Sequence, residues 1–279
     1  MMAPSRGAKP PIARRLAGQG WFLSAPALVL HQFRYDQKTF WRNPASVFFT
    51  VLLPIIFLFI FATIFGDERI EELGGVKTTT YYVPAILALA VISATLVSPA
   101  ISITADRETG VLKRVRGTPL PSWVFIAGRI GNAIVISVLM AVIVTAIGKL
   151  VYDVSVPGET LPAVLVPLAV GAAAFACLGF ALTIVIPSEE SAPAVTNAIA
   201  LPLYFISGIF IPESEIPDGV LHVADVFPFR HFFQAFFHAF DPQTTGAGFE
   251  LGDLAIVAAW GVVGLALAAL FFRWTPRAS

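Results

Sequence analysis

The segment DRETGVLKRVRGTPLP, residues 106–121, carries six charges within its first eleven residues. Long apolar runs lie directly before and after it. Charged side chains are costly in the hydrocarbon core of a bilayer, whereas an apolar run of about 20 residues can cross it as a helix. We therefore expect this segment to lie in water at a membrane surface, between two membrane-spanning helices. A segment in that position suits contact with a soluble partner.

The composition of the whole chain is that of a membrane protein. Of its 279 residues, 57% are hydrophobic and 13% are charged, whereas about a quarter of the residues of a soluble domain are charged. The one cysteine, Cys177, lies in an apolar run, so an intrachain disulfide and a multi-cysteine metal site are excluded. The predicted fold class is all-α integral membrane.

Six apolar runs are long enough to cross the hydrocarbon core as helices. They cover residues 46–65, 82–104, 124–147, 161–186, 192–211 and 254–272. Pro54 lies inside the first run, where a membrane helix can absorb a kink if neighbours satisfy the freed carbonyl. The fourth run is rich in glycine and alanine, which allows close helix approach. Residues 45–273 are therefore predicted to form one six-span transmembrane domain.

The N-terminal region divides into two parts. Residues 1–26 are basic, rich in Pro and Gly and without periodicity, and we expect most of them to form a mobile arm. In residues 27–44 apolar and basic side chains separate on a helical wheel, with Val29, Leu30, Phe33, Phe40 and Trp41 on one face and His31, Arg34, Lys38 and Arg42 on another. This pattern predicts an amphipathic helix in the membrane interface. A helix packed on a soluble domain is the alternative.

Basic residues are divided unevenly between the two sides of the membrane. Thirteen Lys and Arg residues lie in the N-terminal region, in the loop at 105–123 and in the tail, whereas four lie in the loops of the other side. Short basic loops stay on the cytoplasmic side. We therefore expect a multi-pass protein of the cell membrane, with both termini, including the tail at 274–279, in the cytoplasm.

The link between the fifth and sixth spans, residues 212–252, contains a phenylalanine-rich stretch. Residues 227–240 are apolar but too short to cross the membrane, which predicts a re-entrant or interfacial helical hairpin. We expect its phenylalanines to face the outer leaflet, either as a surface that tolerates greasy molecules or as a lipid anchor alone. The residues of this outer re-entrant link are Pro212, Phe227, Pro228, Phe229, Phe232, Phe233, Phe236 and Phe237.

The chain has no motif for an energy source of its own. Gly148-Lys149 lacks the first glycine and the Ser or Thr of a phosphate-binding loop. No Asp or Glu lies in mid-span, where an ion-coupled carrier would place one. No three of the outer-link residues His222, Asp225, His231, His238 and Asp241 have the tight spacing of metal ligands, so no metal is predicted. A membrane-embedded enzyme built on four of them is an alternative. They are His222, Asp225, His231 and His238.

The order of residues in the charged segment indicates more than a membrane anchor. Arg107 and Glu108 lie a turn before Leu112, which is typical of a short helix that continues the second span. Pro119 then disfavours helix at Thr118. A rigid helix that projects from the bilayer and ends at a fixed elbow can transmit force. The alternative is a positive-inside anchor without further role.

These features together resemble the ABC-2 type permeases, the membrane subunits of ATP-binding-cassette exporters. The resemblance rests on RETGVL at 107–112, TPL at 118–120, the return to the membrane near Gly128-Arg129 and SGIFIP at 207–212. It also rests on the layout of an amphipathic helix followed by six spans, and it covers residues 27–273.

The resemblance implies a non-catalytic subunit that works with a separate cytosolic ATPase, which would bind ATP and Mg. The charged segment would be the coupling helix that docks in the ATPase, the interfacial helix would rest beside it, and two permease subunits would pair around a central path in contact with membrane lipids. No nucleic-acid partner is implied. The coupling residues would be Arg107, Glu108, Leu112, Lys113, Arg114, Arg116, Thr118 and Pro119, and those of the interfacial helix Arg34, Lys38, Trp41 and Arg42.

The aromatic composition bears on the cargo. Members of this family export drugs, lipids, lipid-linked glycans and polysaccharides, and sugar stacking favours Tyr and Trp. The chain has 24 Phe but five Tyr and five Trp. We therefore expect a lipophilic cargo, a drug or a lipid, with a polysaccharide or a lipid-linked glycan as the alternative.

Overall fold

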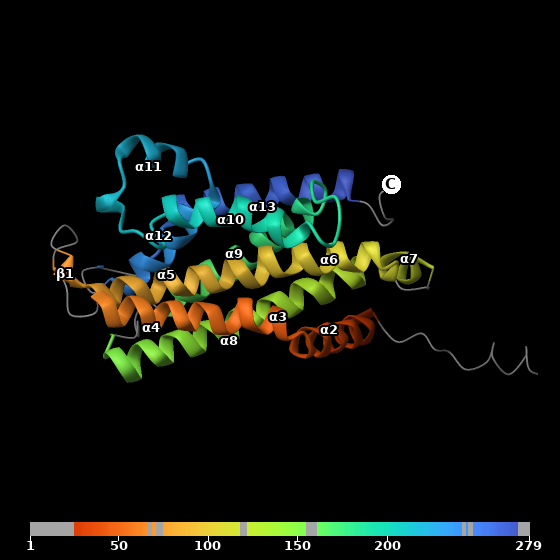
Figure 1. Ribbon diagram of the computed structural model, residues 1–279, viewed down its shortest axis with the longest axis horizontal. Helices are drawn as coiled ribbons and strands as arrows, with labels where there is room; N and C mark the ends of the chain where they lie inside the picture. The colour runs from red at the N-terminus through yellow and green to blue at the C-terminus, as the bar shows by residue number, and fades with distance from the viewer. Residues whose placement is uncertain are drawn as a thin grey trace, which may run out of the picture.

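The computed structural model of the chain describes residues 25–65, 69–70, 75–117, 122–154, 161–241, 244 and 248–272. Most of the predicted arm at 1–26 and the whole tail at 274–279 lie outside these residues. The long helices run side by side along the long axis of an elongated bundle (Figure 1).

Helices make up nearly all of the described chain. The elements are α2 (Ala25–Arg42), α3 (Pro44–Val47), η1 (Phe48–Leu52), α4 (Leu53–Phe65), β1 (Arg69–Ile70), β2 (Val76–Lys77), α5 (Thr78–Ile92), η3 (Ser93–Val97), α6 (Ser98–Glu108), α7 (Val111–Arg116), α8 (Ser122–Tyr152), α9 (Leu161–Leu182), α10 (Ala192–Ile206), η4 (Glu213–Glu215), α11 (Asp218–Ala224), α12 (Pro228–Phe240) and α13 (Leu251–Phe271). The two short strands pair antiparallel.

Five helical segments of the described chain are long and apolar enough to cross a membrane. They are Pro44–Phe65, Thr78–Glu108, Trp123–Tyr152, Leu161–Leu182 and Leu251–Phe271. Each coincides with one predicted span, so the all-α membrane class is confirmed.

The remaining predicted span, 192–211, is helical only in part. Helix α10 has 15 residues and ends at Ile206, a length of about 22 Å at 1.5 Å per residue. Gly208 follows with a φ of +85°, a conformation that glycine adopts without a steric penalty and that ends a helix. Helix α10 therefore covers only the first fifteen residues of this predicted span.

Two π-helical turns lie just before prolines inside long helices. In η1 the Leu53 amide donates to the Phe48 carbonyl directly before Pro54. In η3 the Ser98 amide donates to the Ser93 carbonyl directly before Pro99. Proline lacks an amide hydrogen and clashes with the carbonyl four residues earlier, and a wider turn relieves that clash. The first two long helices absorb Pro54 and Pro99 in this way without ending.

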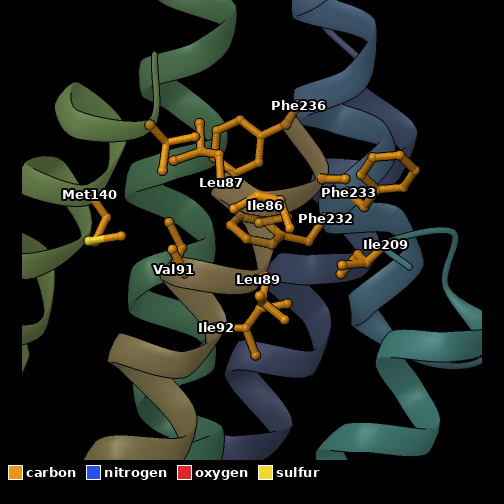
Figure 2. Close-up of a cluster of buried hydrophobic side chains, with 14 of the residues drawn as sticks. Ile86, Leu87, Leu89, Val91, Ile92, Met140, Ile209, Phe232, Phe233 and Phe236 are labelled. Carbon is orange, nitrogen blue, oxygen red and sulfur yellow. The ribbon is translucent and has the colours of Figure 1, made fainter. Parts of the chain in front are cut away.

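Helix α5 lies at the centre of the bundle, and all fifteen of its residues are buried. Side chains from α8, from α12 and from the segment after α10 surround it (Figure 2). The labelled members of this core are Ile86, Leu87, Leu89, Val91 and Ile92 of α5, Met140 of α8, Ile209, and Phe232, Phe233 and Phe236 of α12.

The phenylalanines of α12 belong to this core, so the expectation that they face the outer leaflet is wrong. Phe232, Phe233 and Phe236 are fully buried, and α12 packs against α5, α9 and α13. The Phe232 ring lies 5.0 Å from the ring of Phe175 of α9. Aromatic rings bury the largest areas of any side chains, and α12 presents one on nearly every turn to the space between three helices. Pro228, Phe229 and Phe237 are also buried, whereas Pro212 and Phe227 are half-buried.

Small residues let the helices of the core approach closely. A side-chain carbon at Gly171 of α9 would lie 1.9 Å from Phe232 Cε2, and one at Gly261 of α13 would lie 2.8 Å from the Cβ of Ala174. Between membrane helices, close packing of this kind replaces the hydrophobic driving force that acts in water.

The two ends of the bundle differ in what they carry. Helix α2, helix α7 and the last turns of α13 lie at one end, and β1 and α11 lie at the other (Figure 1). We refer to these as the α7 end and the α11 end.

We predict that Gly171→Ala lowers the free energy of unfolding by about 1–3 kcal/mol, because the added methyl overlaps a buried ring that has no space to move into. Unfolding of the purified protein in mixed micelles measures this change. Gly252→Ala is the matched control, since nothing lies within 4 Å of its added carbon. It should be neutral or slightly stabilising, and an equal loss in both variants would contradict the account of the α9–α12 contact.

Candidate functional site

Helices α6 and α7 meet at a sharp turn at one end of the bundle. Helix α6 ends at Glu108, and Gly110 has a φ of +73°. Glycine adopts this left-handed conformation without a steric penalty. The charged segment does contain a short helix, α7, but the expectation that it continues the second span directly is wrong, because Gly110 breaks the helix between α6 and α7.

Arg107 ties this turn to the end of α9. Its side chain is 3% exposed, and its two terminal nitrogens donate to the carbonyls of Thr183 and Ile186, each at 2.9 Å. Carbonyls at the end of a helix lack intrahelical hydrogen-bond partners, and the Arg107 guanidinium donates hydrogen bonds to two of them. The position of Arg107 is thus that of an internal clamp and not of an exposed docking residue.

Leu112 anchors α7 itself. It is fully buried in a cluster with Ile103, Phe125 and Phe180, whereas Lys113 and Arg114 on the same helix are exposed. Of the other predicted coupling residues, Glu108 is half-buried and pairs with Arg107 at 3.2 Å. The side chain of Arg116 and the whole of Thr118 and Pro119 lie outside the described residues. The described part of α7 is thus a short helix that Leu112 anchors to the bundle, with the side chains of Lys113 and Arg114 exposed.

A charged joint connects α2, α6 and α8 close to this turn. Arg129 of α8 lies between two carboxylates, with its Nε 3.3 Å from Asp36 Oδ1 and an Nη2 ion pair to Asp106. The Asp36 side chain is 1% exposed, and the Gln32 amide donates to both of its oxygens at 3.1 and 3.2 Å. We call Asp36, Asp106 and Arg129 the charged joint.

In the charged joint the cost of burying Asp36 outweighs the attraction between the charges, so the pKa of this carboxyl is raised. Burial raises the pKa of Asp36, while Arg129 and the Gln32 hydrogen bonds act in the opposite direction. Gly128 allows this contact, because a Cβ there would lie 2.4 Å from Gln32 Cγ. Removing one partner of a buried ion pair leaves an uncompensated charge, so the joint fixes α2 to α8.

The role of Asp36 is not apparent from the amphipathic pattern of residues 27–44. A signal was present, because Asp36 is the only acidic residue in 27–44. It also lies on the helix face of Gln32 and Phe40, away from the cations. The predicted interfacial residues Arg34, Lys38, Trp41 and Arg42 are all exposed, whereas Phe40 is buried against the bundle.

A groove opens on the side of the bundle between the first long helix, the second long helix and α10. It has a volume of about 230 Å³, and none of the described residues that line it is charged. The neutral polar side chains are Asn43, Ser46, Thr50, Ser93, Ser98, Asn197 and Tyr204, and they alternate with apolar ones such as Phe49, Phe57, Leu201 and Phe210. We call this the lateral groove. Such a lining can hold an apolar molecule and offer it a few hydrogen bonds.

At the α11 end, the predicted histidine set forms structural pairs. His231 Nδ1 lies 2.7 Å from Asp253 Oδ1, which joins α12 to α13, and His238 Nδ1 lies 3.3 Å from Glu250 Oε1. Arg230 binds both oxygens of Glu213, at 2.9 and 2.8 Å, and pairs with Asp225.

Three of the four residues, Asp225, His231 and His238, line one polar pocket of about 430 Å³. The fourth, His222, is exposed on α11 and does not line this pocket. Within the residues that the structure describes, no three His, Cys, Asp or Glu side chains are arranged to hold a metal ion. The geometry therefore gives no support to the enzyme alternative.

Comparison with known proteins gives one family. The sequence profile of the ABC-2 type transporter family matches residues 28–240. The inner membrane transport permease YadH of Escherichia coli strain K12 is 20% identical over 251 residues, which cover 87% of this chain and 94% of YadH. The putative transport permease YvfS of Bacillus subtilis strain 168 is 24% identical over 202 residues, or 71% of this chain and 79% of YvfS. The daunorubicin resistance ABC transporter permease protein DrrB1 of Streptomyces coeruleorubidus is 28% identical over 212 residues, covering 74% and 71% of the two chains.

The charged joint yields a stability prediction. Arg129→Gln leaves two carboxylates without their cation and should lower the free energy of unfolding by about 3–5 kcal/mol. Adding Asp36→Asn should recover part of that loss, because it removes the buried charge. Unfolding in mixed micelles measures all three proteins.

Lys149→Gln is the matched control, because it also removes a cation of α8 that is paired with an aspartate. In this pair the side chains of Lys149 and Asp153 are 49% and 88% exposed. Exposed pairs contribute little to stability, so this variant should unfold like the wild type. Equal effects of Arg129→Gln and Lys149→Gln would contradict the structural role of the joint.

Proposed function

The chain belongs to the ABC-2 type transporter family, and we propose that it is the permease subunit of an exporter that moves a lipophilic drug or lipid out of the cell. As a subunit of this family it carries out transport, not a reaction of its own. In this proposal a separate cytosolic ATPase binds ATP and Mg and supplies the energy, and a second permease subunit completes the path.

The observation that supports the ATPase partner best is the way in which α7 is anchored to the helix bundle. Lys113 and Arg114 are exposed, whereas Leu112 between the same turns is buried in the bundle. A soluble partner that pushes on the two cations would therefore push on a helix fixed to the ends of α6 and α9. A flexible basic loop could attract a partner by charge, but it could not pass movement to the membrane helices.

The charged joint extends this path to α2. Asp36 belongs to α2, Asp106 to the last turn of α6 and Arg129 to α8. Because a close-packed element tends to move as a rigid unit, a force on α7 would reach α2 and α8 together. We propose that the exposed cations of α2, Arg34, Lys38 and Arg42, rest near the ATPase or on lipid phosphates.

The lateral groove is our candidate for one half of the cargo path. Two of the elements that line it carry exposed apolar side chains, Phe48, Phe49 and Leu52 on η1 and Leu201 and Phe205 on α10. Neighbouring exposed apolar side chains commonly mark a contact with lipid or another protein. A second permease subunit that packed on them would enclose the groove. The lining without charge favours a lipophilic cargo over a charged one. The name of DrrB1, which refers to daunorubicin resistance, agrees with a drug.

For the topology, we propose six crossings with both termini in the cytoplasm. In this proposal α10 and the turn after it form the fifth crossing, and α11 and α12 form a helical hairpin that re-enters from the outer side. The basic residues favour the cytoplasm for the α7 end.

We predict that reversing Lys113, Arg114 and Arg116 to Glu abolishes binding of the ATPase and cargo-stimulated ATP hydrolysis, because like charges would oppose at the docking surface. Pull-down of the tagged protein from detergent extracts of its own cells, followed by an ATPase assay, measures both. Lys149→Glu, at the opposite end of α8, is the control and should bind the ATPase normally. Unchanged stimulated hydrolysis in the triple variant would exclude α7 as the docking helix.

A second prediction tests the groove. Ala45→Phe fills part of the lateral groove from an exposed position and should reduce export of a lipophilic dye about tenfold or more, while the ATPase still binds. Ala266→Phe makes the same change on an exposed face of α13 and should export normally. Normal export of the dye by Ala45→Phe would place the cargo path elsewhere. Loss of glycan export by Ala45→Phe, with normal export of the dye, would favour the glycan alternative.

A further inference from the structure

A second hollow lies at the α7 end, outside the lateral groove and away from the exposed face of α7. It has a volume of about 530 Å³ and is open to the outside of the bundle. Val29, Leu30 and Phe33 of α2 form one wall, and Trp123, Ala127 and Gly131 of α8 form the other. Ala127 and Gly131 lie one turn apart on α8, so the hollow exists where that helix has almost no side chains. We call it the α2–α8 hollow.

The charges of α8 give the depth of the hollow in the bilayer. Arg129 and Lys149 are twenty residues apart in one helix, a rise of about 30 Å, which equals the thickness of the hydrocarbon core. The residues from Trp123 to Arg129 therefore lie at the level of the lipid headgroups, and Gly131 lies just inside the hydrocarbon. Trp123 is 53% exposed, and tryptophan prefers this interface. The hollow thus runs from the headgroups into the acyl chains.

The rim of the hollow carries positive charge. Arg34 follows Leu30 by one turn on the same flank of α2, and Lys38 follows by another turn, so that the three side chains lie in one row. Arg34 and Lys38 are both exposed. The ion pairs identified among the described residues include neither of them. The acids of the charged joint, Asp36 and Asp106, are paired with Arg129, and the Asp36 side chain is buried.

We propose that the α2–α8 hollow binds one anionic phospholipid from the leaflet at the α7 end. One acyl chain lies between α2 and α8 over Ala127 and Gly131, and the phosphate lies at Arg34 and Lys38. The occupant follows from the surroundings, because an apolar hollow at this depth borders on acyl chains and its free cations lie at the level of phosphates. The bound lipid fills space directly beside the Asp36–Arg129 pair, so it presses α2 onto α8 and stabilises the charged joint.

Native mass spectrometry of the purified full chain tests this proposal, with phosphatidylglycerol and phosphatidylcholine of the same acyl chains as probes. The wild type should retain one phosphatidylglycerol, with a preference over phosphatidylcholine of about fivefold or more. Ala127→Leu fills the hollow and should remove retention of both lipids. Arg34→Gln with Lys38→Gln should keep a bound lipid but lose most of the preference. The controls, Ala266→Leu on an exposed face of α13 and Lys149→Gln at the other end of α8, should match the wild type.

Fluorescence gives a second readout that does not require any variant of the hollow floor. Phosphatidylglycerol with brominated acyl chains should quench Trp123, measured as the difference in quenching between the wild type and Trp123→Phe, and dibrominated phosphatidylcholine at the same mole fraction should quench it less. This measurement holds even if Ala127→Leu does not fold.

Two results would overturn the proposal. One is retention of phosphatidylglycerol by Ala127→Leu and by the Arg34/Lys38 double variant at the wild-type level, together with equal quenching of Trp123 by the two brominated lipids. The other is that Ala127→Leu loses the ATPase in a pull-down but keeps its lipid, because the hollow would then be a protein-binding surface. Neither result depends on whether the chain exports a drug, so the proposal can fail while the transport function stands.

Discussion

The burial of α5 on every side is the constraint on which the rest of the structure depends. No face of this helix is left for lipid or water, so α4, α8, α9 and α12 must all pack around it. In a bilayer such packing cannot come from the hydrophobic effect, because lipid tails are as apolar as the side chains. It comes from shape, and the Phe232 ring seated against Gly171 is the closest example. The phenylalanines of α12 thus act as the core of a membrane domain.

The remaining polar groups are used at the two ends and along one side. At the α7 end Arg107 and the charged joint connect a basic surface helix to three membrane helices. At the α11 end His231, Arg230 and their acidic partners fasten α12 to its neighbours. Along the side, the lateral groove offers neutral polar atoms only. In the function that we propose, this distribution would separate force transmission, closure of the outer end and cargo contact into three regions of one domain.

Sequence patterns predicted the fold class, the positions of five long helices and the family, because apolar length and short motifs depend on local sequence alone. They could not tell a buried apolar face from a lipid-facing one, since both consist of the same residues, and the phenylalanines of α12 were therefore assigned to lipid. The end of α10 was missed for a similar reason, because Ser207–Ile211 continues the apolar run although Gly208 breaks the helix. Arg107 was predicted to be a docking residue and Asp36 had no predicted role, because their partners, Thr183 and Arg129, are distant in sequence. Contacts of this kind form only when the helices pack, so the sequence around each residue does not reveal them.

The central claim is that α7 is where the permease meets a soluble ATPase. A photoreactive amino acid placed at Lys113, and separately at Leu150, tests it most directly in native membranes, since Leu150 is 84% exposed near the opposite end of α8. The account predicts a covalent adduct with a nucleotide-binding ATPase from position 113 and none from position 150. Absence of that adduct at 113, or equal adducts from both positions, would contradict it.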